Sequence, residues 1–283
     1  MCGNITVIAV LVRNMKKNNF TLQLMLNLAA SDILCVAMLP VWMCNLLLGW
    51  TMDIHLCRFF IFITHIAIHT SVFIVTLMSV QRYVVVLYRP QWSRLGRRGE
   101  RNMLVFVWIL AGALAFSPAA TYGIVQDGTR QICEQVFRSE EQKVGVLLLE
   151  TIAVFAVPFS ILLVSYLCLH KKVSAQALRS HQRLATLVTS IVVTFFLFWI
   201  PYHIVNVMIM AAPSEPAQLV RRVAYRGPRR VVQGIVFLNS CVNPLLYAFN
   251  YRSLRAENSQ IEIKTPRTSL DSVSCHVQEH PPR

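Results

Sequence analysis

Ionisable side chains inside apolar stretches are the residues of this sequence whose types and spacing could support chemistry. Asp32 and Glu150 each lie within a long apolar run. His65 and His69 are four residues apart, so on a helix their imidazoles share one face. A charged group withdrawn from water is costly unless it binds an ion, a ligand group or a polar partner, so these positions predict binding sites.

Asp32 is the candidate for an ion site. Ser71, Asn239 and Asn243 offer neutral oxygen atoms from other apolar runs, and a carboxylate with such neighbours can hold a small cation such as Na⁺ or take a proton. A hydrogen bond between two helices is the alternative role of Asp32. The sequence has no Gly-rich phosphate loop and no paired metal-ligand spacing. We expect no catalysed reaction, and no cofactor apart from this candidate sodium ion.

The composition indicates that these residues are positioned by membrane-spanning helices. Of the 283 residues, 55% are hydrophobic and 14% are charged, whereas soluble domains carry about 25% charged residues. Apolar runs of about 20 residues, which are long enough to span a bilayer as helices, recur along the chain. We count seven, at 1–13, 22–48, 57–87, 103–124, 144–169, 184–212 and 230–249. The sequence thus predicts an all-α membrane protein, a bundle of seven transmembrane helices.

The basic residues indicate the orientation and the domain limits. With the carboxyl terminus in the cytosol, 18 Lys and Arg residues fall on the cytosolic side and 9 outside, as the positive-inside rule requires. These loops account for the net charge of +14, so we expect no nucleic-acid partner. We predict a multi-pass domain over 1–250 and a cytosolic tail over 251–283. The first run gives only about 18 Å of helix, so we expect a truncated first helix.

Two of the eight cysteines, Cys57 and Cys133, fall in segments that this orientation places outside. The outside is oxidising, so we expect a disulfide bond between them.

Short motifs occur in order along these runs. They are Gly3-Asn4, Leu28-Ala29-Ala30-Ser31-Asp32, Cys57, Arg82-Tyr83, Trp108, Pro158, Tyr166, Phe195…Trp199-Ile200-Pro201 and Asn243-Pro244-Leu245-Leu246-Tyr247. With this ordered set, the chain resembles a rhodopsin-like (class A) G-protein-coupled receptor over roughly residues 3–257.

The resemblance implies a plasma-membrane receptor that signals to a heterotrimeric G protein. It also implies a short cytosolic amphipathic helix after Tyr247, and receptor kinases and arrestin as partners of the tail. It implies that Trp199 senses the ligand, that Tyr166 and Tyr247 rearrange, and that Arg82 meets the G protein. The resemblance assigns further residues to the conformational switch and to G-protein coupling, namely Gln81, Tyr83, Phe195, Pro201, Asn243 and Pro244.

The sequence departs from this family beside Arg82. The family usually has an acid where this chain has Gln81, and the cytosolic end of the sixth run offers His181 and Arg183 in place of an acid. The sequence therefore predicts a resting state without the usual arginine–acid pair.

Two ligand classes are excluded by single positions. An amine receptor of this family needs a carboxylate where this chain has Thr64, and a retinal receptor needs a lysine that residues 231–249 lack. A basic rim formed by Arg221, Arg222, Arg226, Arg229 and Arg230 would instead attract an anion. The candidate ligand-binding residues are His65, His69, Glu150, Tyr202, His203, Asn206, Arg229 and Arg230.

The stretch from Phe198 to Asn206, together with Arg229 and Leu238–Pro244, resembles the leukotriene B4 receptors. The resemblance implies an acidic eicosanoid ligand, coupling to the inhibitory G-protein class and a role in chemotaxis. Two places differ from that subfamily, since Ile61 replaces an expected histidine and 122–124 lacks an arginine. The alternatives are another chemoattractant or peptide receptor of the same class and, from a different class, a transporter or channel. The sequence shows neither the inverted repeats nor the broken helices that are usual in transporters.

Overall fold

The computed structural model describes residues 1–14, 20–175, 179–211 and 227–244, and this part of the chain is mostly helical. In it, four helical segments are long and apolar enough to cross a membrane: Phe20–Leu47, Ile54–Val85, Arg94–Ala120 and Glu140–Leu169. Shorter apolar helices cover Cys2–Arg13 and Phe196–Ala211. The chain divides into the units Met1–Tyr247 and Ala248–Arg283. The second unit, which contains the predicted tail, lies outside the described residues.

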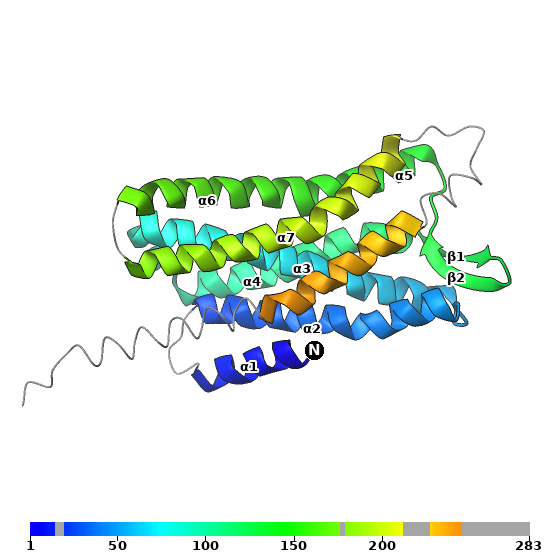
Figure 1. The fold of residues 1–283 in the computed structure, drawn as a ribbon, viewed down its shortest axis with the longest axis horizontal. Helices are drawn as coiled ribbons and strands as arrows, with labels where there is room; N and C mark the ends of the chain where they lie inside the picture. The colour runs from blue at the N-terminus through cyan, green and yellow to red at the C-terminus, as the bar shows by residue number, and fades with distance from the viewer. Residues whose placement is uncertain (15–19, 176–178, 212–226, 245–283) are drawn as a thin grey trace, which may run out of the picture. The chain divides into compact units, whose positions relative to one another are not determined.

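The first unit is a bundle of helices that lie lengthwise beside one another (Figure 1). Its elements are α1 (Cys2–Asn14), α2 (Phe20–Leu47), α3 (Ile54–Leu87), α4 (Arg89–Ala120), strands β1 (Tyr122–Asp127) and β2 (Arg130–Gln135), α5 (Glu140–Glu150), the π-helix η1 (Thr151–Ala156), α6 (Val157–Ala175) and α7 (Arg179–Ala211). A last helix covers 227–244. Because α5, η1 and α6 follow one another without a gap, they form one pass. The predicted seven-helix membrane bundle is confirmed.

Helix α3 is the centre of the bundle, since it contacts α2, α4, α6, α7, η1 and β1. Its buried face carries Val72, Ile74 and Val75, which belong to a core that also includes Leu24 and Leu28 of α2. The outward faces are also apolar. Phe116 is 69% exposed and Leu197 is 67% exposed. Large exposed apolar side chains of this kind suit contact with lipid, because water would disfavour them.

The π-helix η1 lies directly before Pro158. Proline has no N–H to donate to the carbonyl four residues earlier, and its ring clashes with that carbonyl in a regular α-helix. A widened turn removes this clash, and such turns are frequent at functional sites. The turn positions Thr151 and Phe155 beside α7, where both contact His203.

The outer segment between α4 and α5 folds as an antiparallel hairpin. Strands β1 and β2 pair from Tyr122 with Gln135 to Asp127 with Arg130. The two-residue turn is Gly128-Thr129, with Gly128 at a φ of 62°, a conformation that favours glycine, and a glycine at the first turn position is typical of one common hairpin type. That glycine was the available clue to the hairpin.

Candidate functional site

A cavity of about 580 Å³ opens at the end of the bundle where the hairpin lies. Pockets for small molecules usually measure about 300–1,000 Å³, so the cavity is large enough for one. One wall is apolar and comes from α2, α3 and the helix 227–244. It includes Met38, Val41, Trp42, Phe60, Ile61, Ile68, Val236 and Phe237. The polar lining includes His65, Glu150, Tyr202, Arg229, Arg230 and Lys143.

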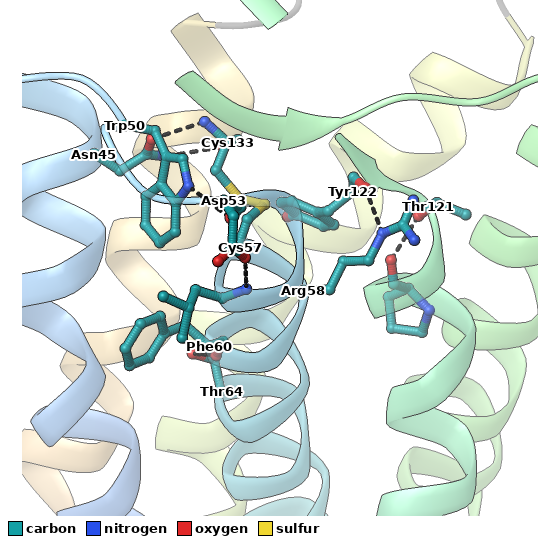
Figure 2. Close-up of a disulfide and its surroundings, with 12 residues drawn as sticks. Asn45, Trp50, Asp53, Cys57, Arg58, Phe60, Thr64, Thr121, Tyr122 and Cys133 are labelled. Carbon is teal, nitrogen blue, oxygen red and sulfur yellow. Dashed lines mark hydrogen bonds between the residues drawn. A yellow bond between two sulfur atoms is a disulfide. The ribbon is translucent and has the colours of Figure 1, made fainter. Parts of the chain in front are cut away.

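The hairpin is fixed over this cavity by the disulfide bond that the sequence indicated (Figure 2). Cys57 at the start of α3 and Cys133 in β2 are bonded, with 5.9 Å between their Cα atoms. Asn45 of α2 bonds both main-chain groups of Cys133, donating to its oxygen at 2.9 Å and accepting from its nitrogen at 2.8 Å. Arg58 Nε donates to the Tyr122 carbonyl oxygen at 3.0 Å. Bonds from both α2 and α3 therefore hold the hairpin in place.

The helix 227–244 contacts the other side of the hairpin through its first turns. Arg230 pairs with Asp127 of β1 at 3.1 Å, and Gln233 Nε2 donates to the Tyr122 hydroxyl at 3.3 Å. Burial raises the pKa of the Tyr122 phenol, and the nearby Arg229 partly offsets that rise. In the sequence of 212–230, which contains the arginine rim, the one acidic residue is Glu215. Asp127 is a second opposing charge, more than 100 residues away along the chain.

Arg229 has a neutral partner. Its Nη2 donates to the Gln135 side-chain oxygen, and its buried Nε has no hydrogen-bond partner among the described residues. Lys143, which the sequence reading missed, also borders the cavity and pairs with Glu140. Of these cations, Arg230 and Lys143 are thus paired with carboxylates, whereas the described partner of Arg229, which also lines the cavity, is neutral.

The floor of the cavity is polar. Glu150 is 6% exposed, and its Oε1 accepts a hydrogen bond from the Tyr202 hydroxyl at 2.9 Å. His65 Nε2 lies 3.9 Å from the same oxygen. The other carboxylate oxygen, Oε2, is buried and has no partner in the described part of the chain. The structure therefore brings together three of the predicted ligand residues at one point.

Three other predicted ligand residues lie behind the cavity wall. His69, His203 and Asn206 are buried but do not border the large cavity. His69 instead lines a separate cavity of about 10 Å³, with Ser117 and Glu150. His65 and His69 do share a helix face, as predicted, but His69 lies one turn deeper.

Asp32 is fully buried between helices in the middle of the bundle. Its Oδ1 accepts from the Ser71 hydroxyl at 3.3 Å, and its Oδ2 accepts from Asn243 Nδ2 at 2.8 Å. Asn239 is buried too, but no bond joins it to Asp32 among the described contacts. Carboxylate and hydroxyl oxygens are suitable ligands for Na⁺, so Asp32 and Ser71 fit the expected ion. The described residues contain no group of three or more His, Cys, Asp or Glu that could hold a metal.

The opposite end of the bundle holds the residues expected to meet the G protein. Gln81 is buried, and its side-chain oxygen accepts from the Thr21 hydroxyl at 3.2 Å. Arg82 forms no ion pair with a side chain that the structure describes. Tyr83 lies beside Tyr88, with ring centroids 6.0 Å apart. The side chains of Phe195, His181 and Arg183, and all of Tyr247, lie outside the described residues.

The remaining switch positions lie along α6, α7 and the last helix. Trp199 is 2% exposed and borders the cavity floor, and Pro201 lies two residues further along α7. Tyr166 is in α6 and is half-buried. Helix α1 approaches Pro244 closely, because a Cβ added at Gly3 would lie 2.9 Å from the Pro244 Cβ.

Comparison with known proteins agrees with this architecture. The human leukotriene B4 receptor 1 is 30% identical over 255 residues, covering 87% of this chain and 72% of that receptor. The human neuropeptides B/W receptor type 1 is 30% identical over an alignment of 281 residues, covering 92% and 82%. The C5a anaphylatoxin chemotactic receptor 1 of Danio rerio is 29% identical over 240 residues, covering 81% and 68%.

A family model described as "7 transmembrane receptor (rhodopsin family)" matches residues 3–247. This match covers most of the chain, and it extends from the start of α1 to the end of the last described helix. The protein therefore belongs to the rhodopsin family of seven-transmembrane, G-protein-coupled receptors.

Proposed function

We propose that this receptor binds an acidic lipid of the leukotriene B4 type and signals to heterotrimeric G proteins of the inhibitory class. Its family consists of signalling receptors and not of enzymes. The observation that carries the ligand proposal is Arg229, a cation at the cavity rim whose described partner is neutral. A carboxylate would form a stronger, charge-assisted bond with this guanidinium than Gln135 does.

The rest of the cavity suits the other parts of such a ligand. The wall of α2, α3 and the helix 227–244 offers an apolar surface for a hydrocarbon chain. At the floor, Glu150 Oε2 has an unused acceptor, which suits a hydroxyl group of the ligand. An amphipathic chain with one carboxylate and hydroxyl groups matches these three features together.

Signalling would begin at Trp199, which borders the same cavity. Movement of α7 would then open the cytosolic end around Arg82, where the G protein binds. The proposal includes a sodium ion at Asp32 with Ser71, Asn239 and Asn243, and residues 1–250 as the receptor domain. It also includes the plasma membrane as the location, and a cytosolic tail that receptor kinases and arrestin recognise.

A peptide or chemoattractant ligand is the second candidate. It is favoured by the similarity to receptors for neuropeptides B/W and C5a. Glu134 of the hairpin and Arg138, which follows the hairpin, both line the cavity and could contact a peptide main chain. A transporter or channel is disfavoured by the family match.

The test is ligand-stimulated nucleotide exchange on purified G protein of the inhibitory class, with the full chain in lipid nanodiscs. Leukotriene B4, its methyl ester, C5a and neuropeptide B would be compared at equal concentrations. We expect leukotriene B4 to stimulate exchange and the ester to be weaker. Stimulation by a peptide and not by the lipid would replace the first proposal by the second.

A further inference from the structure

A second and much smaller cavity lies between α3, α4, α5 and η1. Its volume is about 10 Å³, which is close to the smallest volume that holds one water molecule. Leu114 of α4 and Val154 of η1 contribute to an apolar wall. Three polar side chains complete the lining, namely His69 of α3, Ser117 of α4 and Glu150 of α5. A cavity of this size and lining suits one small polar molecule.

His69 carries two buried polar atoms at this cavity. Its side chain is 1% exposed, and neither Nδ1 nor Nε2 has a hydrogen-bond partner among the described residues. The main-chain oxygen of Ala111 lies near the ring, but not in hydrogen-bonding geometry. A neutral imidazole has one N–H donor and one acceptor nitrogen. Because an unpaired polar atom away from water costs free energy, we expect a partner for the imidazole inside the cavity.

Glu150 lines both cavities. Its Oε1 accepts from the Tyr202 hydroxyl at 2.9 Å and lies 3.9 Å from His65 Nε2, and both of these residues border the large cavity. Its Oε2 is buried and has no partner in the part of the chain that the structure describes. Glu150 therefore joins the polar floor of the large cavity to the small cavity.

We propose that the small cavity binds one water molecule, and that this water makes His69 a positioning residue for Glu150. The water donates one hydrogen bond to Glu150 Oε2 and one to the acceptor nitrogen of His69, and it accepts a bond from the Ser117 hydroxyl. Buried waters make about three hydrogen bonds, so these three partners satisfy it. His69 thus acts on Glu150 from outside the large cavity, whereas the sequence placed it among the ligand contacts.

The functional consequence of this water rests on the proposed role of Glu150 in ligand binding. A carboxylate oxygen has two lone pairs, so Oε2 can accept from the water and also from a ligand hydroxyl. The water holds the carboxylate in one orientation before the ligand arrives, which lowers the cost of ordering it on binding. Loss of the water should therefore weaken binding without removing a direct ligand contact.

The water can be tested without a ligand, by solid-state NMR of the full chain in lipid bilayers. Histidine labelled with ¹³C and ¹⁵N reports on the rings of all eight histidines, and His69→Phe identifies the resonances of His69. Magnetisation transferred from water to the ring protons of His69 shows that a water contacts the imidazole. His65, which borders the large cavity, is the positive control. Ser117→Val is the matched variant, because its methyl groups replace the hydroxyl and fill the small cavity.

We expect transfer to the His69 ring in the wild type. In Ser117→Val this transfer should be lost, while the His69 resonances remain and the transfer to His65 is unchanged. No transfer in the wild type would overturn the proposal. Transfer that persists in Ser117→Val would also overturn it, because the water would then lie outside the small cavity. If Ser117→Val does not fold, Val146→Ile fills the same cavity by one methyl group and decides the same question.

The link from His69 to Glu150 has its own readout. Glutamate is labelled at the side-chain carboxyl carbon, and Glu150→Gln identifies the resonance of Glu150. His69→Phe should shift this resonance, and His69→Gln should restore it toward the wild-type position, because an amide can donate and accept as the imidazole does. A role in packing alone predicts the opposite order, since phenylalanine keeps a flat ring and glutamine does not. An unchanged resonance in His69→Phe would show that His69 does not position the carboxylate.

Ligand binding supplies the last readout. Leukotriene B4 affinity should fall about two- to tenfold in His69→Phe, as expected for the loss of one hydrogen bond, and should recover in His69→Gln. In the Glu150→Gln background, His69→Phe should have no further effect. An equal further loss in that background would show that His69 does not act through Glu150. If the lipid does not bind the wild type, the ligand proposal fails, while the two resonance tests still decide the water and its link to Glu150.

Discussion

Replacing Arg229 by alanine should weaken the binding of an acidic lipid by about 30-fold. Truncating one member of a buried, hydrogen-bonded charge pair costs about 2–5 kcal/mol. Arg229 is only half-buried, and it already has a bond to Gln135, so we take the lower limit of about 2 kcal/mol, which corresponds to about 30-fold in Kd. The change should appear mainly as faster dissociation, since the encounter rate depends on the whole basic rim.

The hairpin contact complicates this substitution, because Arg229→Ala also removes the bond to β2. Gln135→Ala is the matched control, since it removes the same bond and keeps the guanidinium. We expect Gln135→Ala to keep or increase the affinity for the acid, because the neutral competitor is gone. Arg138→Ala should have little effect, although Arg138 also borders the cavity, because this side chain is exposed.

The assay is equilibrium competition against tritiated leukotriene B4, with the acid and its methyl ester on each variant in nanodiscs. If Arg229 pairs with the carboxylate, the ester should bind the wild type more weakly than the acid does, and Arg229→Ala should bind both forms about equally. A ratio of acid to ester affinity that is the same in the wild type and in Arg229→Ala would refute the reasoning. The carboxylate would then lie elsewhere, and Lys143 would be the next residue to replace.

Three further predictions concern the disulfide, the resting state and the ion. Mapping of non-reduced peptides should find Cys57 bonded to Cys133, and Cys133→Ser should lower the free energy of unfolding by about 2–5 kcal/mol; free thiols at both positions would contradict this. Gln81→Asp should lower ligand-free nucleotide exchange about fivefold, because a charge-assisted bond to Arg82 adds about 1 kcal/mol to the resting state, and unchanged exchange would exclude that pairing. Sodium should inhibit ligand-free exchange of the wild type but not of Asp32→Asn, and inhibition that persists in the variant would place the ion elsewhere.

The helices could be predicted because each apolar run is close to the length that crosses a bilayer. The run 22–48 became α2 (Phe20–Leu47), and 57–87 became α3 (Ile54–Leu87). The hairpin was missed because β1 and β2 are short and mix polar with apolar residues, so their pattern does not stand out beside the long apolar runs. The widened turn η1 was also missed, since Pro158 in the sequence marks a disturbance but not its form.

Helical periodicity predicts the face on which a side chain lies, but not how far along the helix it lies relative to the cavity. The spacing of His65 and His69 correctly placed both on one face, but a cavity wall covers only a limited length of that face. His65 meets Glu150 at the floor, whereas His69 lies a turn lower, outside the cavity. His203 follows Tyr202 directly, yet Tyr202 borders the cavity and His203 contacts η1.

Contacts between segments that are far apart in the sequence explain the other differences between the predicted site and the structure. They also change the chemistry expected of the arginine rim. Read along the sequence, Arg229 and Arg230 are equivalent neighbours with no acid close by. The hairpin brings Asp127 to Arg230 and Gln135 to Arg229, so one guanidinium pairs with a carboxylate and the other, within the described part of the chain, bonds a neutral amide. The same hairpin is held by Cys57, which makes its position depend on α3 as well as on the last helix. An anionic ligand that displaces Gln135 from Arg229 would therefore loosen one attachment of the hairpin while the disulfide keeps the other. The charge of the ligand and the position of the hairpin are therefore linked through Arg229. Gln135→Ala removes only the bond to the hairpin, whereas Arg229→Ala also removes the guanidinium, so comparing the two variants separates the two effects.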